Sequence, residues 1–427
     1  MTKHQFLHVA DVHLDSPLAN LKRLDQSAAE QLQIASRKSF ENIIDFALAR
    51  EVIGVVIAGD LFDGPVRDAT AGIWVETQLK RLSRAGIQVA LIRGNHDANS
   101  NARKIAQWPA LIHEFGTDKP TTEIWENVGI AVHGQSFSAR CESADLAAQY
   151  PEPVMGMFNL GLLHTSLAGS ANHDTYAPTT VATLENRGYD YWALGHIHVR
   201  SQNSHSDQCF VGFSGNTQGR HIKETGPKGC SLVHLQDGKL KEVEFIATDC
   251  FRWFSVDLDV SELETLGAIE DELETPILRV LSQSDGRPMA IRLNLVGATQ
   301  LHGQLQKLGA KQQLTESISS RLKDFGPIWL EKLRINTTAY FASQPHESYI
   351  QPLKYLSEVS ESYRSNPTLQ KDLLQDLEEL FRKSRKELSE YGFALANADE
   401  SSTELSEVIC QAEQMLASRI AGVSHED

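Results

Sequence analysis

Short apolar runs in the first 250 residues alternate with longer segments of mixed polarity. These runs, typical of buried strands, span residues 6–10, 52–58, 87–92, 160–163 and 191–194. Between them, apolar residues recur at helical spacing, as in the stretch from Phe40 to Leu48. Apolar strands that alternate with amphipathic helices are typical of sheets whose faces are covered. The pattern therefore predicts a layered α/β domain over residues 1–250, with a β-sandwich flanked by helices.

The pattern changes after residue 250. Alternating strands are predicted at 254–258, 291–295 and 329–335, with helices at 262–274 and 314–322. This predicts a small α+β capping domain over 251–342, without a polar cluster of its own.

A helical tail is predicted at the end of the chain, over 343–427. Its first part, 343–352, is rich in Ser, Gln and Pro and reads as a linker. One amphipathic helix then begins at Asn366 and Pro367, and a second begins at the capping box of residues 401–404. Two such helices cannot form a core alone, so they must pack on this protein or on a partner, and both alternatives stay open.

Each predicted strand of the first domain ends in a polar cluster. The clusters supply Asp11, His13, Asp60, Asn95, His96, His164, His196 and His198. Loops at the carboxyl ends of strands gather on one edge of an α/β sheet, so we expect these side chains to meet. Carboxylate, imidazole and amide oxygen suit manganese, iron, zinc or magnesium, and the absence of thiolate argues against a structural zinc site. Two ions about 3.5–4 Å apart, bridged by a carboxylate, would use all of these groups but one histidine.

The motifs DxH, GDLxD, GNHD, a lone His after a strand and GHxH occur here in this order. Over residues 5–220 they resemble the calcineurin-like metallophosphoesterase superfamily, and "HVADVHLD", "GDLFD" and "IRGNHD" resemble SbcD-type DNA repair nuclease subunits. The resemblance implies one ion held by Asp11, His13, Asp60 and His198, and another held by Asp60, Asn95, His164 and His196. It also implies that His96 is catalytic, either stabilising the transition state or protonating the leaving alkoxide, and that Asp97 orients His96 or a ligand.

The resemblance implies a function as well. It suggests a nuclease that uses two Mn²⁺ ions to hydrolyse DNA phosphodiester bonds in repair, with an SMC-like coiled-coil ABC ATPase docked on the C-terminal tail and the capping domain steering DNA. Some relatives carry histidine where this chain has Asp63, so exonuclease action is expected but its balance with endonuclease action stays open. The alternatives are a phosphodiesterase or phosphatase for small molecules such as cyclic nucleotides, and a metal-binding scaffold without turnover. A homodimer is left open.

The glycine-rich stretch "SGNTQGRHIKETGPKG", residues 214–229, follows the last ligand motif. Its basic residues are Arg220, His221, Lys223 and Lys228. A basic loop lined by backbone N–H groups predicts contacts with phosphates or DNA. Arg103 and Lys104, just after GNHD, fit a helix surface as well as a DNA contact.

Charge and composition limit these expectations. The net charge of -16 disfavours a nucleic-acid partner on charge alone, although bound metal ions would reverse the local sign. The five cysteines are odd in number and scattered, so no disulfide framework is expected. No apolar run approaches the roughly 20 residues that cross a bilayer, and the N-terminus lacks a signal-peptide pattern. We therefore expect a cytoplasmic protein with no membrane partner.

Overall fold

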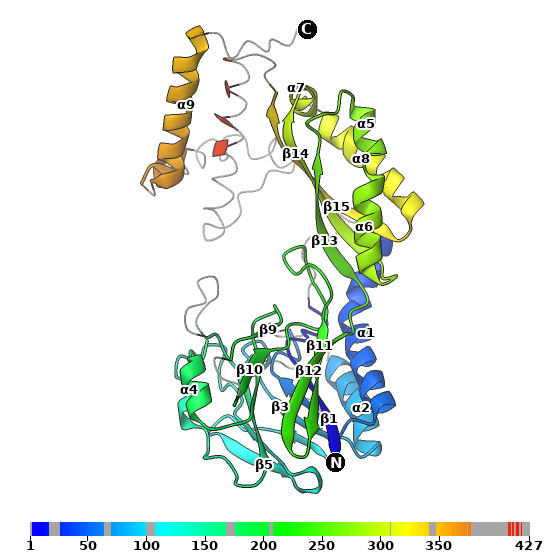
Figure 1. Cartoon of the computed structure of the whole chain (residues 1–427), viewed down its shortest axis with the longest axis vertical. Coiled ribbons are helices and arrows are strands. Elements are labelled where there is room, and N and C mark those ends of the chain that lie inside the picture. The colour runs from blue at the N-terminus through cyan, green and yellow to red at the C-terminus, as the bar shows by residue number, and fades with distance from the viewer. Residues whose placement is uncertain are drawn as a thin grey trace. The chain divides into compact units, whose positions relative to one another are not determined.

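The chain forms two compact units in the computed structural model. The structure describes residues 2–16, 26–63, 70–99, 107–167, 176–204, 208–307, 309–340, 347–366, 368–373, 375–376, 409–410, 412–413, 416–417 and 420. The first unit contains residues 1–256, 275–292 and 319–332, and the second contains 257–274, 293–318 and 333–427. Figure 1 shows their helices and strands.

The first unit contains a six-stranded mixed sheet in the order β12-β11-β1-β2-β3-β4. Its strands are β1 (Lys3–Val9), β2 (Gly54–Ala58), β3 (Gln88–Ile92), β4 (Ile112–Glu114), β11 (Gly229–Gln236) and β12 (Lys239–Ala247). Strands β1 to β4 are parallel, whereas β11 is antiparallel to both β1 and β12. Helices α1 (Gln26–Arg50) and α2 (Thr70–Arg84) cover one face, where Ile43 and Leu79 pack with Leu7 and Ile57 (Figure 1).

A second six-stranded sheet has the order β5-β6-β7-β8-β10-β9. Its strands are β5 (Thr121–Trp125), β6 (Ile130–Gly134), β7 (Phe158–His164), β8 (Tyr191–Gly195), β9 (Ser201–Gln202) and β10 (Phe210–Phe213). Helix α4 (Val181–Asn186) covers its outer face through Leu184, which packs with Trp192. Short 3₁₀ helices lie at η2 (Asp97–Asn99), η3 (Glu126–Val128) and η4 (Ala147–Gln149).

The two large sheets pack face to face. Phe6 and Val56 of the first sheet share one buried cluster with Phe158, Leu160 and Tyr191 of the second. Together with the helices on the two outer faces, this gives four layers. The predicted α/β sandwich flanked by helices is therefore confirmed.

A third sheet follows, with strand order β13-β14-β15. Its elements are β13 (Arg252–Asp259), α5 (Leu266–Asp271), α6 (Glu274–Ser284), β14 (Met289–Thr299), α7 (His302–Leu305), α8 (Ala310–Leu322), η5 (Lys323–Phe325) and β15 (Ile328–Ala339). The pairing is parallel, because Arg252 bonds to Pro288 and Val260 bonds to Val296, both through backbone N–H groups. The three strands predicted from alternation are confirmed, with helices between them.

The helix predicted over 262–274 is divided into α5 and the start of α6. Pro276 gives a physical reason. A proline ring clashes with the carbonyl four residues earlier inside a helix, but it is tolerated in the first turn, where its missing N–H is not needed. Pro276 therefore sits near the start of a new helix and does not continue the old one.

The linker predicted over 343–352 is wrong from Glu347 onward, because helix α9 (Glu347–Ser365) already includes Pro352. Pro352 is the sixth residue of that helix, so its missing N–H removes one intrahelical hydrogen bond. Leu353, Leu356 and Val359 are partly buried at helical spacing, and this stripe favours the helix.

The predicted cap at Asn366 is confirmed, since its Oδ1 accepts a 2.9 Å hydrogen bond from the Thr368 N–H. Leu377, Leu380, Phe381, the basic run 382–386 and the capping box at 401–404 lie outside the described residues. Part of the last segment packs on α9: Ser360 donates to Glu413 at 2.5 Å, and Ile409 is buried. Among the described helices, none combines the length and apolarity needed to cross a membrane.

His8 is a buried histidine of the core, with 1% of its surface exposed. Its Nδ1 lies 3.0 Å from the Tyr191 hydroxyl, and its Nε2 lies 3.1 Å from the Leu194 carbonyl oxygen. Burial lowers the pKa of His8 to about 3, although the Leu194 contact partly opposes this. The imidazole is therefore neutral in the folded protein across the physiological range.

This burial predicts a specific loss of stability in acid. As pH falls below about 6.5, His8 becomes protonated in the unfolded chain. In the folded chain it becomes protonated only near pH 3. The stability present above pH 6.5 is lost across this window by about 1.4 kcal/mol per pH unit. We expect the free energy of unfolding of His8→Asn, measured in urea between pH 4 and 7, to depend less steeply on pH than that of the wild type. The difference in slope should correspond to about one proton. An unchanged slope would contradict the assignment.

Candidate metal centre

The polar clusters converge where the strands of the two large sheets end, and the backbone there is unusual. Asp11, His13, Asp60 and His196 have positive φ angles of 51°, 47°, 51° and 100°. Residues other than glycine rarely adopt this region, and each instance costs of order 1–3 kcal/mol. Such strain persists where the surrounding structure requires it, and four of the ten described non-glycine residues with positive φ are predicted ligands.

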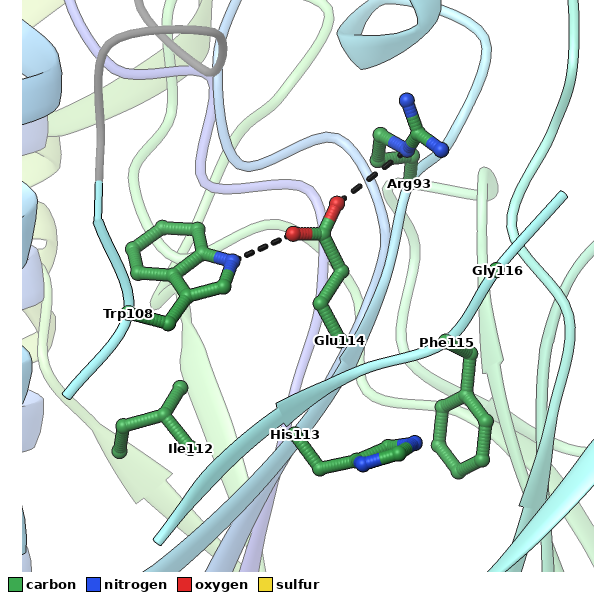
Figure 2. Close-up of a pocket in the computed structure, with 7 residues that line it drawn as sticks. All are labelled: Arg93, Trp108, Ile112, His113, Glu114, Phe115 and Gly116. Atoms are coloured by element: carbon green, nitrogen blue, oxygen red, sulfur yellow. Dashed lines mark hydrogen bonds and ion pairs between the residues drawn. The ribbon is translucent and has the colours of Figure 1, made fainter. Parts of the chain in front are cut away.

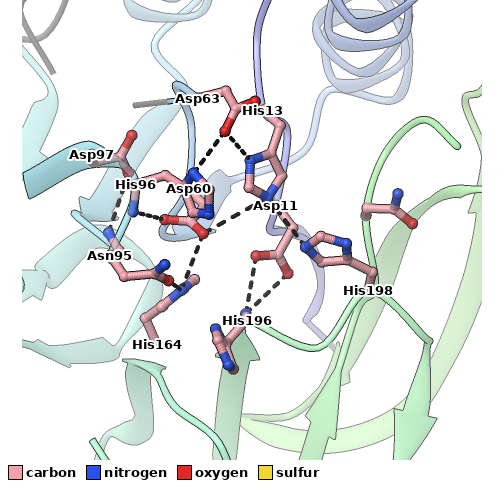
Figure 3. A network of polar contacts seen from close by, with 12 residues as sticks. Asp11, His13, Asp60, Asp63, Asn95, His96, Asp97, His164, His196 and His198 are labelled. Atoms are coloured by element: carbon pink, nitrogen blue, oxygen red, sulfur yellow. Dashed lines mark hydrogen bonds and ion pairs between the residues drawn. The ribbon is translucent and has the colours of Figure 1, made fainter. Parts of the chain in front are cut away.

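Three overlapping groups of side chains have the geometry to hold a cation. They are Asp11 with His13 and His198, His13 with Asp60 and His96, and Asp11 with Asp60 and His164, and in each group the ligand atoms lie within 4.8 Å of one another. Figure 3 shows these side chains turned toward a common centre. Asp11, His13 and Asp60 each belong to two of these groups. Asp60 Oδ2 lies 3.7 Å from His13 Nε2 and 3.4 Å from His164 Nε2, so its carboxylate is close to ligands of different groups.

The group of Asp11, His13 and His198 places ring nitrogens where they have few hydrogen-bond partners within the protein. The Nε2 atoms of His13 and His198 face each other at 3.2 Å, and His13 Nε2 is 3.7 Å from Asp60 Oδ2. Glu224 Oε1 lies 2.7 Å from His198 Nδ1, which places a proton on Nδ1 and the lone pair on Nε2. A lone pair directed at a second imidazole and a carboxylate fits a divalent cation.

The side chains around His164 also direct several hydrogen-bond acceptors at one point. His164 Nδ1 donates to the Ala58 carbonyl oxygen at 2.9 Å, so its Nε2 carries a lone pair when the ring is neutral. That Nε2 lies 2.9 Å from Asn95 Oδ1 and 3.4 Å from Asp60 Oδ2. His164 Nε2, Asn95 Oδ1 and Asp60 Oδ2 are all acceptors, and they repel one another unless a cation or a proton lies between them. Burial alone would lower the pKa of His164, but the charge of Asp60 raises this pKa to about 9, as expected where positive charge is needed.

His196 occupies a less direct position. Its backbone N–H donates to both oxygens of Asp11 at 3.0 Å, and its ring centroid is 5.3 Å from that of His164. In the described residues, no group that could hold a metal includes the His196 side chain. The structure thus brings His196 to the site, with its backbone orienting Asp11.

His96 lies at the exposed side of the cluster, with its side chain 32% accessible. Its Nδ1 is 2.6 Å from Asp63 Oδ1, and its backbone N–H donates to Asp60 Oδ1 at 2.9 Å. Asp63 also lies 3.5 Å from His13 Nδ1. The hydrogen bond that the His96 ring donates to Asp63 raises the pKa of His96 above its ordinary value. Asp63 therefore orients two histidines at once.

Asp97 was predicted to orient His96 or a ligand, and its hydrogen bonds lie with the loops that carry the ligands. Its carboxylate accepts backbone N–H bonds from Leu61, Phe62 and Gly94 at 3.1, 2.7 and 3.2 Å. Burial, together with the charge of Asp60, raises the pKa of Asp97 to about 7. Asp97 thus joins the loops after β2 and β3, and acts on Asp60 through the backbone.

Gly94 shows how closely these loops approach. A Cβ atom added there would lie 2.3 Å from Asp60 Oδ1 and 2.7 Å from the His164 ring. Real Cβ atoms essentially never come so close. The glycine of the GNHD motif is therefore required for the bridging carboxylate and its histidine neighbour to meet.

The basic loop of residues 214–229 meets the prediction only in part. His221 and Lys223 are exposed. Lys228 is buried, with its Nζ directed at the His198 carbonyl oxygen at 3.4 Å, and its contact with phosphate stays a prediction. Arg220 lies beside His198, at 3.1 Å from its Nδ1. Arg103 and Lys104 lie outside the described residues.

A pocket of about 500 Å³ lies at the end of β3 and along β4. It is lined by Arg93, Trp108, Ile112, His113, Glu114, Phe115 and Gly116 (Figure 2). Glu114 accepts from the Trp108 indole N–H, and its other oxygen is 3.2 Å from Arg93 Nε. Because Arg93 directly precedes the GNHD motif, this ion pair ties the edge strand to the loop that carries Asn95 and His96.

Comparisons with known proteins agree with this geometry. Residues 4–200 match the family model described as calcineurin-like phosphoesterase, and residues 253–338 match the model described as metallophosphoesterase YhaO, middle domain. The uncharacterized metallophosphoesterase YhaO of Bacillus subtilis is 35% identical over 300 residues, which is 70% of this chain and 72% of the relative. The DNA double-strand break repair protein Mre11 of Methanopyrus kandleri is 26% identical over 275 residues, which is 58% of each chain.

The crystal structure of TT1561 of Thermus thermophilus is similar at a TM-score of 0.34 and 14% identity, covering 57% of this chain and 99% of that one. The YhaO relative carries the assignment, because it is matched over 72% of its length at 35% identity. The clustered His and Asp side chains supply the metal-binding groups such an enzyme needs. The chain belongs to the calcineurin-like phosphoesterase family and is a metal-dependent phosphoesterase.

Proposed function

We propose that this protein is a divalent-metal-dependent nuclease, acting mainly as an exonuclease, that hydrolyses DNA phosphodiester bonds in repair. One observation carries the chemical part of the proposal. Three overlapping groups of ligand atoms share the buried residues Asp11, His13 and Asp60, and His96 lies on the exposed side of the same cluster. A phosphodiester entering from solvent would meet both features together.

In this proposal the ligands divide as the resemblance implies. Asp11, His13, Asp60 and His198 hold one ion, and Asp60, Asn95, His164 and His196 hold the other. The bound ions, which we propose are Mn²⁺, supply charge neutralisation of the phosphate and a lowered pKa of bound water. The protein residues fix where the substrate and its protons lie.

His96 is proposed as the group that acts on the leaving oxygen. Its Nδ1 is engaged by Asp63, so Nε2 is left for the substrate. A histidine with a pKa raised above its ordinary value can carry the proton that a leaving alkoxide requires. We propose that Asp63 orients the ring of His96 and that Asp97 holds the loop that carries Asp60.

The DNA substrate and the partner rest on similarity to named repair proteins. The Methanopyrus Mre11 is named as a DNA double-strand break repair protein, and this chain matches 58% of it. We propose that residues 251–342 steer DNA toward the site and that residues 343–427 dock an SMC-like ATPase. Exposed His221 and Lys223 are proposed to contact the DNA backbone.

A phosphodiesterase for small molecules is the second candidate, and the net charge of -16 favours it because a duplex is repelled by an acidic protein. Hydrolysis of a DNA oligonucleotide and of bis-p-nitrophenyl phosphate, each with Mn²⁺, separates the two. We expect both to be cleaved, with kcat/KM higher for the oligonucleotide. Cleavage of the small diester alone would support the second candidate.

A further inference from the structure

Glu224 is a buried carboxylate at the centre of the loop that follows the last ligand motif. Only 7% of its side chain is accessible. Oε1 lies 2.7 Å from His198 Nδ1 and 3.2 Å from Arg220 Nη2, while Oε2 accepts from Asn216 Nδ2 at 2.9 Å and from the Arg220 N–H at 2.8 Å. Both oxygens of Glu224 are therefore engaged, and one carboxylate holds both an imidazole and a guanidinium.

Arg220 has donors that this network does not use. A guanidinium carries five N–H groups. In the part of the chain that the structure describes, Glu224 is the only carboxylate bonded to Arg220, and Arg220 Nε is buried without a hydrogen-bond partner. An unpaired buried donor of this kind is costly unless an acceptor arrives. The side chain is 17% accessible, so it can meet such an acceptor at the surface of the site.

The position of Arg220 identifies the acceptor. Nη2 lies 3.1 Å from His198 Nδ1, and the Nε2 atom across the same ring faces His13 at 3.2 Å. The guanidinium is thus one imidazole ring away from the candidate metal position. An anion bound by a metal ion there would be attracted by the charge of the guanidinium, and a phosphate matches the fork of a guanidinium well.

We propose that Arg220 forms a phosphate-binding position beside the ion held by His198, and that Glu224 is the positioning residue for both side chains. The inference rests on the proposed phosphodiester hydrolysis and deepens it, because it names the group that receives a non-bridging oxygen of the phosphodiester. Glu224 also offsets the repulsion between a guanidinium and a nearby divalent ion. One oxygen of Glu224 contacts both partners, so metal binding and phosphate binding are coupled through it.

The test uses Arg220→Lys and Glu224→Gln, with Arg84→Lys and Glu242→Gln as matched controls at exposed positions of the same unit. Calorimetric titration of Mn²⁺ without substrate is expected to show unchanged affinity for Arg220→Lys. For Glu224→Gln it is expected to show one of two sites weakened about 10–100-fold. Thermal unfolding of each variant identifies any general loss of structure.

Phosphate binding is measured separately, by titrating inorganic phosphate into the Mn²⁺-loaded protein and by KM for bis-p-nitrophenyl phosphate. Arg220→Lys is expected to weaken phosphate binding and to raise KM, each by about tenfold, with kcat less affected. In Glu224→Gln, excess Mn²⁺ should restore kcat while KM stays raised. The double variant should be no worse in KM than the more affected single variant, because both changes remove the same contact.

Two results would overturn the proposal: wild-type phosphate affinity in Arg220→Lys, or wild-type affinity for both Mn²⁺ ions in Glu224→Gln. These readouts do not depend on turnover. If the wild-type protein cleaved neither diester, the proposed nuclease function would fail, whereas the Mn²⁺ and phosphate titrations would still decide the roles of Glu224 and Arg220.

Discussion

Replacing Asp60 by asparagine is expected to remove the binding of both metal ions and to reduce phosphodiester hydrolysis by at least about a thousandfold. Metal ions supply several kcal/mol of transition-state stabilisation, and each 1.36 kcal/mol corresponds to a factor of ten in rate. Because Asp60 belongs to two of the three ligand groups, its loss weakens both positions at once.

The substitution is chosen to preserve shape. Asparagine can still accept the His96 N–H that Asp60 Oδ1 accepts at 2.9 Å. What it removes is the charge at Oδ2, which lies 3.4 Å from His164 Nε2 and 3.7 Å from His13 Nε2. Burial would raise the pKa of Asp60, but the charge of His164 holds this pKa well below its usual range, so the native side chain is an anion.

Mn²⁺ content per chain and the rate on bis-p-nitrophenyl phosphate are the two measurements. Asp118→Asn is the matched control, because Asp118 is exposed and far in sequence from the motifs. It should retain wild-type metal content and rate. Retention of two Mn²⁺ ions by Asp60→Asn would show that the carboxylate is not shared between them.

The meeting of distant motifs was predictable because it follows from sheet topology. Strands β1, β2 and β3 are parallel neighbours, so Asp11, Asp60 and Asn95 emerge at one edge. The second sheet brings His164 and His198 to the same place from distant parts of the chain. Apolar runs that end abruptly in acids and histidines carry this information.

The orientation of individual side chains was not predictable in the same way. Asp97 was expected to orient His96 or a ligand, yet Asp63 lies 2.6 Å from His96, and Asp97 bonds to backbone N–H groups. Asp60, which lies in the same loop as Asp63, has a positive φ of 51°. Nothing in the residue pattern of GDLFD specifies a strained backbone at a non-glycine position.

The burial of Glu224 and Lys228 in the loop after β10 could not be predicted from the sequence either. Glu224 carries the second contact of His198, but it is the one acid among basic residues in a polar segment without periodicity. Lys228 and Lys223 lie in the same polar segment and cannot be distinguished by its residue pattern. Lys228 is buried and Lys223 is exposed. Burial of a charged residue in a loop depends on partners that are distant in the chain, such as Asp249, which accepts the Lys228 N–H at 3.2 Å.

Replacing His96 by asparagine is expected to lower kcat on a DNA oligonucleotide by about 10²–10⁴-fold, with Mn²⁺ affinity unchanged. Asparagine can keep a hydrogen bond to Asp63 but cannot deliver a proton. An alkoxide leaving from DNA requires that proton, whereas p-nitrophenolate is stable without it. If His96 protonates the leaving group, hydrolysis of bis-p-nitrophenyl phosphate should therefore fall much less than hydrolysis of DNA.

The comparison of the two substrates decides between the roles open to His96. Equal losses on DNA and on bis-p-nitrophenyl phosphate would mean that His96 stabilises charge on the phosphate itself. His113→Asn is the matched control, because His113 is another partly exposed histidine, with Nδ1 3.3 Å from Glu123 Oε2. Wild-type kcat on both substrates in His96→Asn would exclude either role, since a side chain that touches the reacting atoms cannot be removed without changing the rate.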